Sequence, residues 1–209
     1  YDFHGQTIFV TGGFGVLGGA MVAALAAHGA NVAVLSRRPG AAARVVERFG
    51  ADSGPGSIWG VEGDVLDTGA LAAATAAVID HFGAIDGLIN AAGGNRPEAI
   101  SNHAANPARS FFDLSPDAMR WVFDLNLMGT VLPSQIVGRH MAQRGRGVIL
   151  NITSMAAIRP LTRVAAYAAA KAAVGNFTQW LAVYMAQEYG SAIRVNALAP
   201  GFFLGEQNR

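Results

Sequence analysis

Two side chains in the second half of the chain have the types and spacing needed to exchange a proton. Tyr167 and Lys171 lie one helical turn apart in the alanine-rich run 164–188, so both project from the same helix face. A phenol has a pKa of about 10 and needs help to ionise near neutral pH, and a fixed ammonium stabilises the phenolate. We therefore predict that Lys171 lowers the pKa of Tyr167 and that Tyr167 acts as a general acid and base.

Ser154 and Asn126 are the other two candidates for catalysis. Ser154 follows the apolar run 148–152, where a short loop can turn its hydroxyl toward the tyrosine-bearing helix to hold a substrate oxygen. Asn126 interrupts an otherwise apolar helical stretch, and a buried amide needs partners, for which a water relay to Lys171 is a candidate. Taken singly, a helical Tyr and Lys pair is more often surface packing, and a Ser after a strand is usually a cap.

A glycine-rich turn near the amino terminus favours the catalytic interpretation. Residues 11–19 read Thr-Gly-Gly-Phe-Gly-Val-Leu-Gly-Gly, between a strand-like run and a helical one. Glycines let the backbone approach a pyrophosphate, and the helix amino terminus attracts its charge, whereas the Lys of a P-loop is missing. A tight turn without a ligand is the alternative. The residues expected to contact a dinucleotide here are Gly12, Gly13, Phe14, Gly15, Val16, Leu17 and Gly18.

Three later segments complete the predicted cofactor site. Where an NAD-preferring protein carries Asp or Glu for the ribose hydroxyls, this chain has Ser36, Arg37 and Arg38. Arginines suit an adenosine 2′-phosphate, so NADP(H) is favoured, with NAD(H) as the alternative and a solvated loop as the other explanation of the arginines. Two further short motifs are weak evidence when taken alone. They predict contacts from Asp64 and Val65 near the adenine and from Asn90, Ala91, Ala92 and Gly93 beside the crevice.

The elements that must position these residues alternate regularly along the chain. The expected strands are 7–10, 31–35, 57–62, 87–90, 148–152 and 193–197, and the expected helices are 16–27, 41–49, 68–82, 116–141 and 164–188. This alternation is typical of an α/β fold, a Rossmann-type doubly wound parallel sheet with helices on both faces. One long segment, 93–114, lacks either pattern, and segments of that length are usually functional or disordered.

Composition bounds the classes of function. With 209 residues, 52% hydrophobic and 14% charged, the chain can bury one core, so a single domain over 1–209 is expected. A net charge of +1 gives no indication of a nucleic-acid partner. Without Cys there is no disulfide framework or thiol nucleophile, and the histidines lack metal-ligand spacing, so no catalytic metal is predicted. No secretion signal or unbroken apolar run of about 18 residues is found, so we expect a cytoplasmic protein without a membrane partner.

Over essentially its whole length the chain resembles the short-chain dehydrogenase/reductase family. The resemblance rests on the glycine turn, on 90–93, on the four candidate catalytic residues, and on Pro200 and Gly201 after the last strand. It implies that Tyr167 donates or accepts the proton and that Lys171 binds the nicotinamide ribose. It also implies that Ser154 polarises the carbonyl and that Asn126 maintains a proton relay. One departure is Val16, where the family usually has its middle glycine.

A subset of the family, similar to fructuronate or mannonate oxidoreductases, carries such a Gly-Val-Leu-Gly turn. The chain also resembles this subset at 93–97, 159–163 and 201–209, which implies a keto-sugar acid substrate. Polar groups suited to a polyhydroxy carboxylate are expected at the pocket mouth, and Arg could clamp the carboxylate, although surface roles explain these residues equally well. The substrate contacts predicted in this way are Gly94, Asn95, Arg96, Ser154, Arg159, Arg163 and Tyr167, with Gln207 and Asn208 as further donors.

Hydride transfer between a nicotinamide cofactor and a small-molecule carbonyl or secondary alcohol is thus the leading prediction. The alternatives are a 3-oxoacyl or general sugar or steroid reductase of the same family, and a non-catalytic NADP-sensing or scaffold protein. The family resemblance implies a dimer or tetramer through the helices 116–141 and 164–188, whose sides are more apolar than one sheet face requires. The family closes its substrate pocket with residues beyond Gly201, so that segment is expected to be missing.

Overall fold

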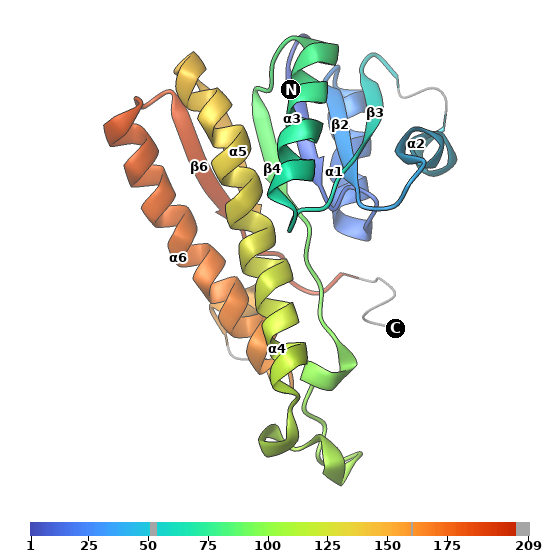
Figure 1. The fold of residues 1–209 in the computed structure, drawn as a ribbon, viewed down its shortest axis with the longest axis vertical. Helices are drawn as coiled ribbons and strands as arrows, with labels where there is room; N and C mark the ends of the chain where they lie inside the picture. Colours follow the sequence, from blue (N-terminus) through green and yellow to red (C-terminus); the bar gives the residue numbers. More distant parts are fainter. Residues whose placement is uncertain (51–53, 160, 204–209) are drawn as a thin grey trace.

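The computed structural model describes residues 1–50, 54–159 and 161–203, and parallel strands form its centre (Figure 1). Within these ranges six strands form one sheet in the order β3-β2-β1-β4-β5-β6, and every neighbouring pair is parallel. The predicted Rossmann-type class is confirmed. The strands are β1 (Thr7–Thr11), β2 (Asn31–Ser36), β3 (Ser57–Glu62), β4 (Gly87–Asn90), β5 (Gly147–Ile152) and β6 (Ile193–Leu198).

Helices cover both faces of the sheet because alternate strand residues bury apolar side chains on opposite sides. Phe9 of β1 belongs to a core cluster with residues of α3, α5 and α6, whereas its neighbours Ile8 and Val10 pack with residues of α1 and α2. Among the described residues no helix is both long and apolar enough to span a bilayer. The helices are α1 (Val16–Ala27), α2 (Ala41–Phe49), α3 (Thr68–Phe82), α4 (Pro116–Phe123), α5 (Gly129–Arg144) and α6 (Ala165–Glu188).

The prediction of one continuous α-helix over 116–141 is wrong at residues 124–128. After α4 comes a π-helical turn, η4 (Asp124–Met128), and only then does α5 begin. A π turn accommodates an extra residue without ending the helix, so apolar periodicity alone does not reveal it. Asn126 lies inside this turn and is fully buried.

The irregular segment 93–114 projects away from the sheet at the lower end of Figure 1. It contains three short 3-10 turns, η1 (Pro97–Ala99), η2 (Pro107–Arg109) and η3 (Phe111–Asp113). Backbone hydrogen bonds attach it to the body: Ser101 N donates to Arg163 O at 2.9 Å, and Ser115 N donates to Glu98 O at 3.4 Å. The segment is therefore built of ordered turns, anchored beside α4 and the loop before α6.

The strand order reverses between β1 and β4, which are neighbours in the sheet but lie far apart in the sequence. In open parallel sheets a ligand crevice forms at such a reversal, outside the carboxyl ends of the strands. The glycine-rich turn follows β1 at this edge, residues 91–93 follow β4, and Ser154 follows β5. The topology thus brings the predicted cofactor and catalytic segments to one edge of the sheet.

Candidate functional site

The glycine-rich turn has no room for side chains at two of its glycines. Gly12 has φ +67°, and a Cβ there would lie 2.5 Å from the carbonyl carbon of Ala91, while a Cβ on Gly18 would lie 2.4 Å from Gly12 O. Only glycine therefore fits at these two positions, and the exposed backbone of Gly15, which precedes α1, is where a phosphate could approach the helix. Val16 begins α1 with a side chain that is 51% exposed, so the departure from the family pattern causes no crowding.

Two hollows meet at this turn. We call them the Tyr167 hollow, of about 590 Å³, and the Arg37 hollow, of about 480 Å³, after one lining residue of each. They form one continuous crevice, because both are lined by Gly12, Phe14, Gly15, Ala91 and Gly93. A hollow on either side of the amino terminus of α1 suits a dinucleotide, because each hollow can take one nucleoside while the pyrophosphate lies at the helix end.

Most of the residues predicted from the sequence line this crevice. The Tyr167 hollow adds Val16, Leu17, Gly18, Gly94, Asn126, Ser154, Tyr167, Lys171, Pro200 and Gly201. The Arg37 hollow adds Ser36, Arg37, Arg38, Asp64, Val65 and Ala92.

Two predicted cofactor residues lie beneath the surface instead of lining either hollow. Gly13 is buried, and a Cβ there would lie 2.7 Å from Val34 Cγ1, so this glycine lets the turn pack against β2. The Asn90 amide is buried in the sheet and donates to Ser134 Oγ and Asn151 Oδ1, both at 2.9 Å. In this structure both residues support the crevice from below.

Lys171 is almost completely buried in the wall of the Tyr167 hollow. Its Nζ donates to Ile152 O at 2.8 Å and lies 5.7 Å from the centroid of the Tyr167 ring. Burial penalises the ammonium and lowers the pKa of Lys171 to about 8. The group therefore changes charge in a range where enzymes work.

Tyr167 and Ser154 meet in the same hollow. Burial raises the pKa of the Tyr167 phenol, and a hydrogen bond with Ser154 acts in the opposite direction. The pKa of Tyr167 is thus raised, against the expectation that Lys171 lowers it, and the Lys171 Nζ donates to the Ile152 carbonyl. Ser154 also caps a short 3-10 turn, η5 (Met155–Ala157), since its Oγ accepts from Ala156 N at 3.1 Å.

The Asn126 amide holds the backbone of Gly94 from both sides. Its Nδ2 donates to Gly94 O at 2.7 Å and to Val122 O at 2.8 Å, and its Oδ1 accepts from Gly94 N at 3.2 Å. A Cβ on Gly93 would lie 2.7 Å from Asn126 Oδ1 and 3.2 Å from Lys171 Nζ. Backbone groups therefore partner the buried amide, and Gly93 lies directly against two candidate catalytic residues.

The residues predicted to bind substrate, apart from Gly94, Ser154 and Tyr167, do not line the two hollows. Arg96 lies over the Trp121 ring, with its guanidinium carbon 4.2 Å from the centroid, and Arg96 N donates to Asn95 Oδ1. Arg163 has φ +76° and accepts from Ser101 through its carbonyl, while Arg159 is exposed on the same loop. Gln207 and Asn208 lie outside the described residues.

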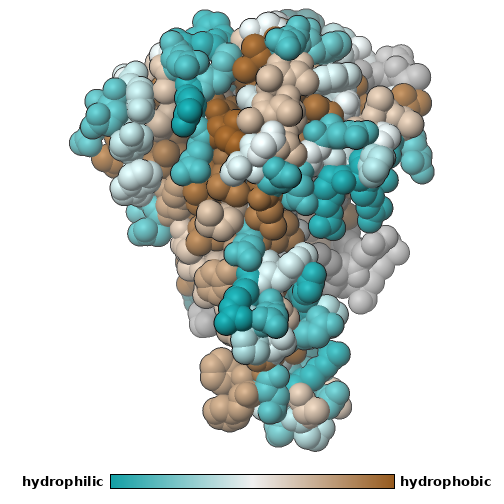
Figure 2. All heavy atoms as spheres, viewed as in Figure 1, coloured by the Kyte–Doolittle hydropathy of each residue, from teal (hydrophilic) through white to brown (hydrophobic). Residues whose placement is uncertain are grey.

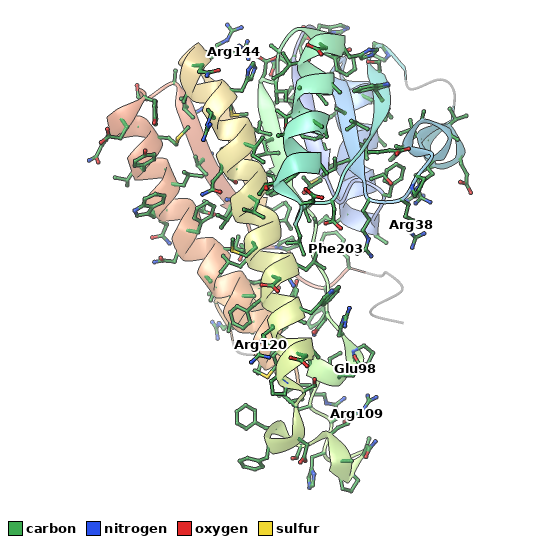
Figure 3. All side chains as sticks on the ribbon, in the orientation of Figure 1. Arg38, Glu98, Arg109, Arg120, Arg144 and Phe203 are labelled. Atoms are coloured by element: carbon green, nitrogen blue, oxygen red, sulfur yellow. The ribbon has the colours of Figure 1, made fainter. Side chains whose placement is uncertain are left out.

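Sequence reasoning missed several lining residues. Arg44 lines the Arg37 hollow, Arg48 lines the Tyr167 hollow, and both come from α2. The signal was a basic helix directly after Arg37 and Arg38, but only the packing of α2 shows which of its side chains reach the crevice. Thr153 and Phe203 also line the Tyr167 hollow, and Phe203 is labelled in Figure 3.

The lowered pKa of Lys171 makes a prediction about stability. Between about pH 8 and pH 10.5 the unfolded chain retains the proton that the folded chain has lost, so the free energy of unfolding should rise with pH across this window. Lys171→Met removes this contribution. Urea unfolding at several pH values should therefore show the stability of the wild type rising relative to the variant from pH 8 to 10, and parallel curves would contradict the shift.

Comparisons with known proteins agree with this geometry. The oxidoreductase UxuB of Bacillus subtilis (strain 168), described as uncharacterized, is 43% identical over 211 residues, covering 99% of this chain and 74% of UxuB. A candidate D-mannonate oxidoreductase from Haemophilus influenza, solved with bound NAD, is 38% identical with a TM-score of 0.89, covering 100% of this chain and 75% of that one. An NADPH-dependent 3-quinuclidinone reductase from Rhodotorula rubra is 28% identical with a TM-score of 0.80. The match covers 98% of this chain and 72% of the reductase.

The family match extends over the sheet and the crevice together. The model of the short chain dehydrogenases matches residues 6–209, which include the glycine-rich turn, the lining of both hollows and every strand described above. The structural neighbour from Haemophilus also agrees with the resemblance to mannonate oxidoreductases. We conclude that the chain belongs to the short-chain dehydrogenase family and is an oxidoreductase that uses a nicotinamide cofactor.

Proposed function

We propose that the protein reduces or oxidises a keto-sugar acid at a carbonyl or secondary alcohol, with Tyr167, Ser154 and Lys171 at the reacting end. The observation that carries the proposal is their convergence in a hollow continuous with the one lined by Ser36, Arg37 and Arg38. A bound nicotinamide supplies or accepts the hydride at the substrate carbon. The substrate would therefore bind in the Tyr167 hollow, between the Tyr167 hydroxyl and the backbone of Gly93.

Tyr167 moves the proton that accompanies the hydride. In reduction its hydroxyl proton goes to the substrate oxygen as the carbon gains hydride, and in oxidation the phenolate accepts that proton. Ser154 holds the same oxygen and stabilises its developing negative charge through a hydrogen bond. Lys171, whose Nζ lies 5.7 Å from the centroid of the Tyr167 ring, is the candidate for holding the nicotinamide ribose. Asn126 fixes the position of Gly94 in the crevice wall.

A keto-sugar acid is the favoured substrate class. The relatives support it, because the Haemophilus protein is named for D-mannonate. Arg159 and Arg163 precede α6, and Asn95 and Arg96 begin the projecting segment; none of the four lines the two hollows, so their contact with a substrate is part of the proposal. A 3-oxoacyl or steroid substrate would instead present a largely apolar surface, so comparing the two kinds of substrate separates the alternatives.

A substrate panel tests the proposal. Fructuronate, other keto-sugar acids, a 3-oxoacyl thioester and a ketosteroid are offered with NADPH and with NADH, and cofactor oxidation is followed by absorbance. We expect kcat/KM for at least one keto-sugar acid to exceed that for the thioester and steroid by about 100-fold or more. Turnover of the thioester or steroid alone would reject the sugar-acid substrate, and binding of cofactor with no turnover would favour an NADP-sensing protein.

The cofactor preference is also a proposal. Arg37 and Arg38 line the crevice where the adenosine ribose is expected, which favours NADP(H), although one relative was solved with NAD and another is NADPH-dependent. Arginine pairs with phosphate through two parallel hydrogen bonds. The panel should therefore show a lower KM for NADPH than for NADH.

Association into a dimer or tetramer would cover the outer side of α6. This helix exposes Trp180, Val183 and Tyr184, and the Trp180 and Tyr184 rings stack with centroids 5.1 Å apart. Figure 2 shows apolar and polar atoms mixed on the face with α3 and α5, and the apolar atoms are concentrated near the middle of the molecule. Large exposed aromatic side chains commonly mark a protein interface. Sedimentation should detect the assembly, and Trp180→Ser should weaken it.

A further inference from the structure

A third guanidinium reaches the Arg37 hollow from α2. Arg44 lines this hollow together with Ser36, Arg37 and Arg38, but it belongs to the helix that follows their loop. Its backbone is fixed by the first turn of α2, where Arg44 N donates to Gly40 O at 3.0 Å. Arg37 and Arg38 have exposed side chains, whereas Arg44 is half-buried, so α2 holds this cation more firmly than the loop holds the other two.

The Arg44 side chain is positioned by stacking and has an unused hydrogen-bond donor. Its guanidinium carbon lies 5.0 Å from the centroid of Phe14, a residue of the glycine-rich turn that lines both hollows. The face of an aromatic ring attracts a guanidinium and orients its plane. Arg44 Nε is buried and has no hydrogen-bond partner among residues 1–50, 54–159 and 161–203. A buried donor without an acceptor is energetically unfavourable.

The charges around Arg44 favour an anion. The hollow is lined by three guanidinium groups and by one carboxylate, that of Asp64, whose Oδ1 accepts from Leu66 N at 2.9 Å. The Ser36 hydroxyl is engaged in its own turn, because Ser36 Oγ donates to Arg38 O and accepts from Arg38 N. Figure 3 shows Arg38 beside α2, at the end of the sheet where the strands terminate. An anion in this hollow would therefore meet cations from both the loop and the helix.

We propose that Arg44 is a specificity-determining residue that binds the adenosine 2′-phosphate of NADP(H), with Phe14 as the platform that fixes its guanidinium. The inference rests on the proposed preference for NADP(H). A phosphate offers several acceptor oxygens, and a guanidinium already held in place loses less conformational freedom on binding than the exposed Arg37 and Arg38 side chains. Arg44 thus contributes to discrimination against NAD(H), although it lies on α2 and outside the loop that carries Arg37 and Arg38.

The test uses two probes that differ only in the 2′-phosphate. Adenosine 2′,5′-bisphosphate and 5′-AMP are titrated calorimetrically into the full chain, the wild type and three variants. The wild type should bind the bisphosphate at least about tenfold more tightly than 5′-AMP. Arg44→Met keeps an unbranched side chain on Phe14 but removes the charge, so it should lose about tenfold in bisphosphate affinity and change 5′-AMP affinity by less than about twofold.

Two further variants control for charge and folding. Arg44→Lys keeps the charge without the planar fork and should bind the bisphosphate with intermediate affinity. Arg139→Met removes an exposed cation from α5, outside both hollows, and should bind both probes as the wild type does. Circular dichroism checks that each variant is folded before titration, and the Lys variant replaces the Met variant if the latter unfolds.

The outcomes separate this inference from the proposed cofactor preference. A wild type that binds both probes equally would overturn the NADP(H) preference, and the role of Arg44 with it. A wild type that prefers the bisphosphate while Arg44→Met keeps the same preference would overturn the role of Arg44 alone. Equal losses for both probes would assign Arg44 to the adenosine in general and would also refute a role in specificity.

Discussion

Tyr167→Phe is expected to lower kcat by about 10²- to 10⁴-fold, the usual contribution of a positioned proton donor. The phenyl ring keeps its packing in the cluster with Ala99, Ala118 and Val122, so the fold and the crevice should be unchanged. Only the hydroxyl that bonds with Ser154 is lost. The affinity for NADPH should change by less than about twofold, since the variant removes a contact needed for proton transfer and leaves the Arg37 hollow intact.

Steady-state turnover of the best substrate from the panel, together with fluorescence titration of NADPH, measures both quantities. Tyr184→Phe provides a matched control, because Tyr184 lies on the same helix with 38% of its surface exposed and lines neither hollow. This control should retain wild-type kcat. If Tyr167→Phe turned over substrate as fast as the control, Tyr167 would not be the proton donor.

Gly93→Ala is expected to reduce kcat/KM by about 100-fold or more, because displacements of about 1 Å at a reacting centre have effects of that size. The added methyl would lie 2.7 Å from Asn126 Oδ1 and 3.2 Å from Lys171 Nζ. Both neighbours are buried and hydrogen-bonded to backbone, so neither can move aside without losing a partner. The methyl would also narrow the junction of the two hollows.

Gly175→Ala separates this effect from the general effect of losing a glycine. Gly175 lies within α6, and a Cβ there meets nothing within 4 Å, so the control should keep full activity and gain about 0.5 to 1 kcal/mol from better helix propensity. Activity assays and urea unfolding of both variants make the comparison. Full activity of a folded Gly93→Ala protein would contradict the close contact that the structure gives.

The sequence predicted the strands and most helices because their patterns are local. The i, i+4 spacing placed Tyr167 and Lys171 on one side of α6, and the end of β5 placed Ser154 near them. The π turn at 124–128 escaped prediction, because an extra residue in a helical turn does not break the run of apolar residues.

The partners of the buried polar groups could not be predicted, since they come from distant parts of the chain. Asn126 holds the backbone of Gly94, and Lys171 donates to the carbonyl of Ile152. Neither backbone group carries a sequence signal, because every residue type offers the same carbonyl and, proline apart, the same N–H. Arg44 was missed for a related reason: the orientation of α2 against the sheet decides which of its side chains reaches the crevice.

The contact between Gly12 and Ala91 has a consequence for protein engineering. The two backbones lie so close that not even a methyl group fits between them, although one follows β1 and the other follows β4. A chimera that took the glycine-rich turn from one parent and residues 91–93 from another would combine two backbone segments whose packing is not matched. Either segment should therefore be exchanged between relatives without loss of stability only when both are transplanted together.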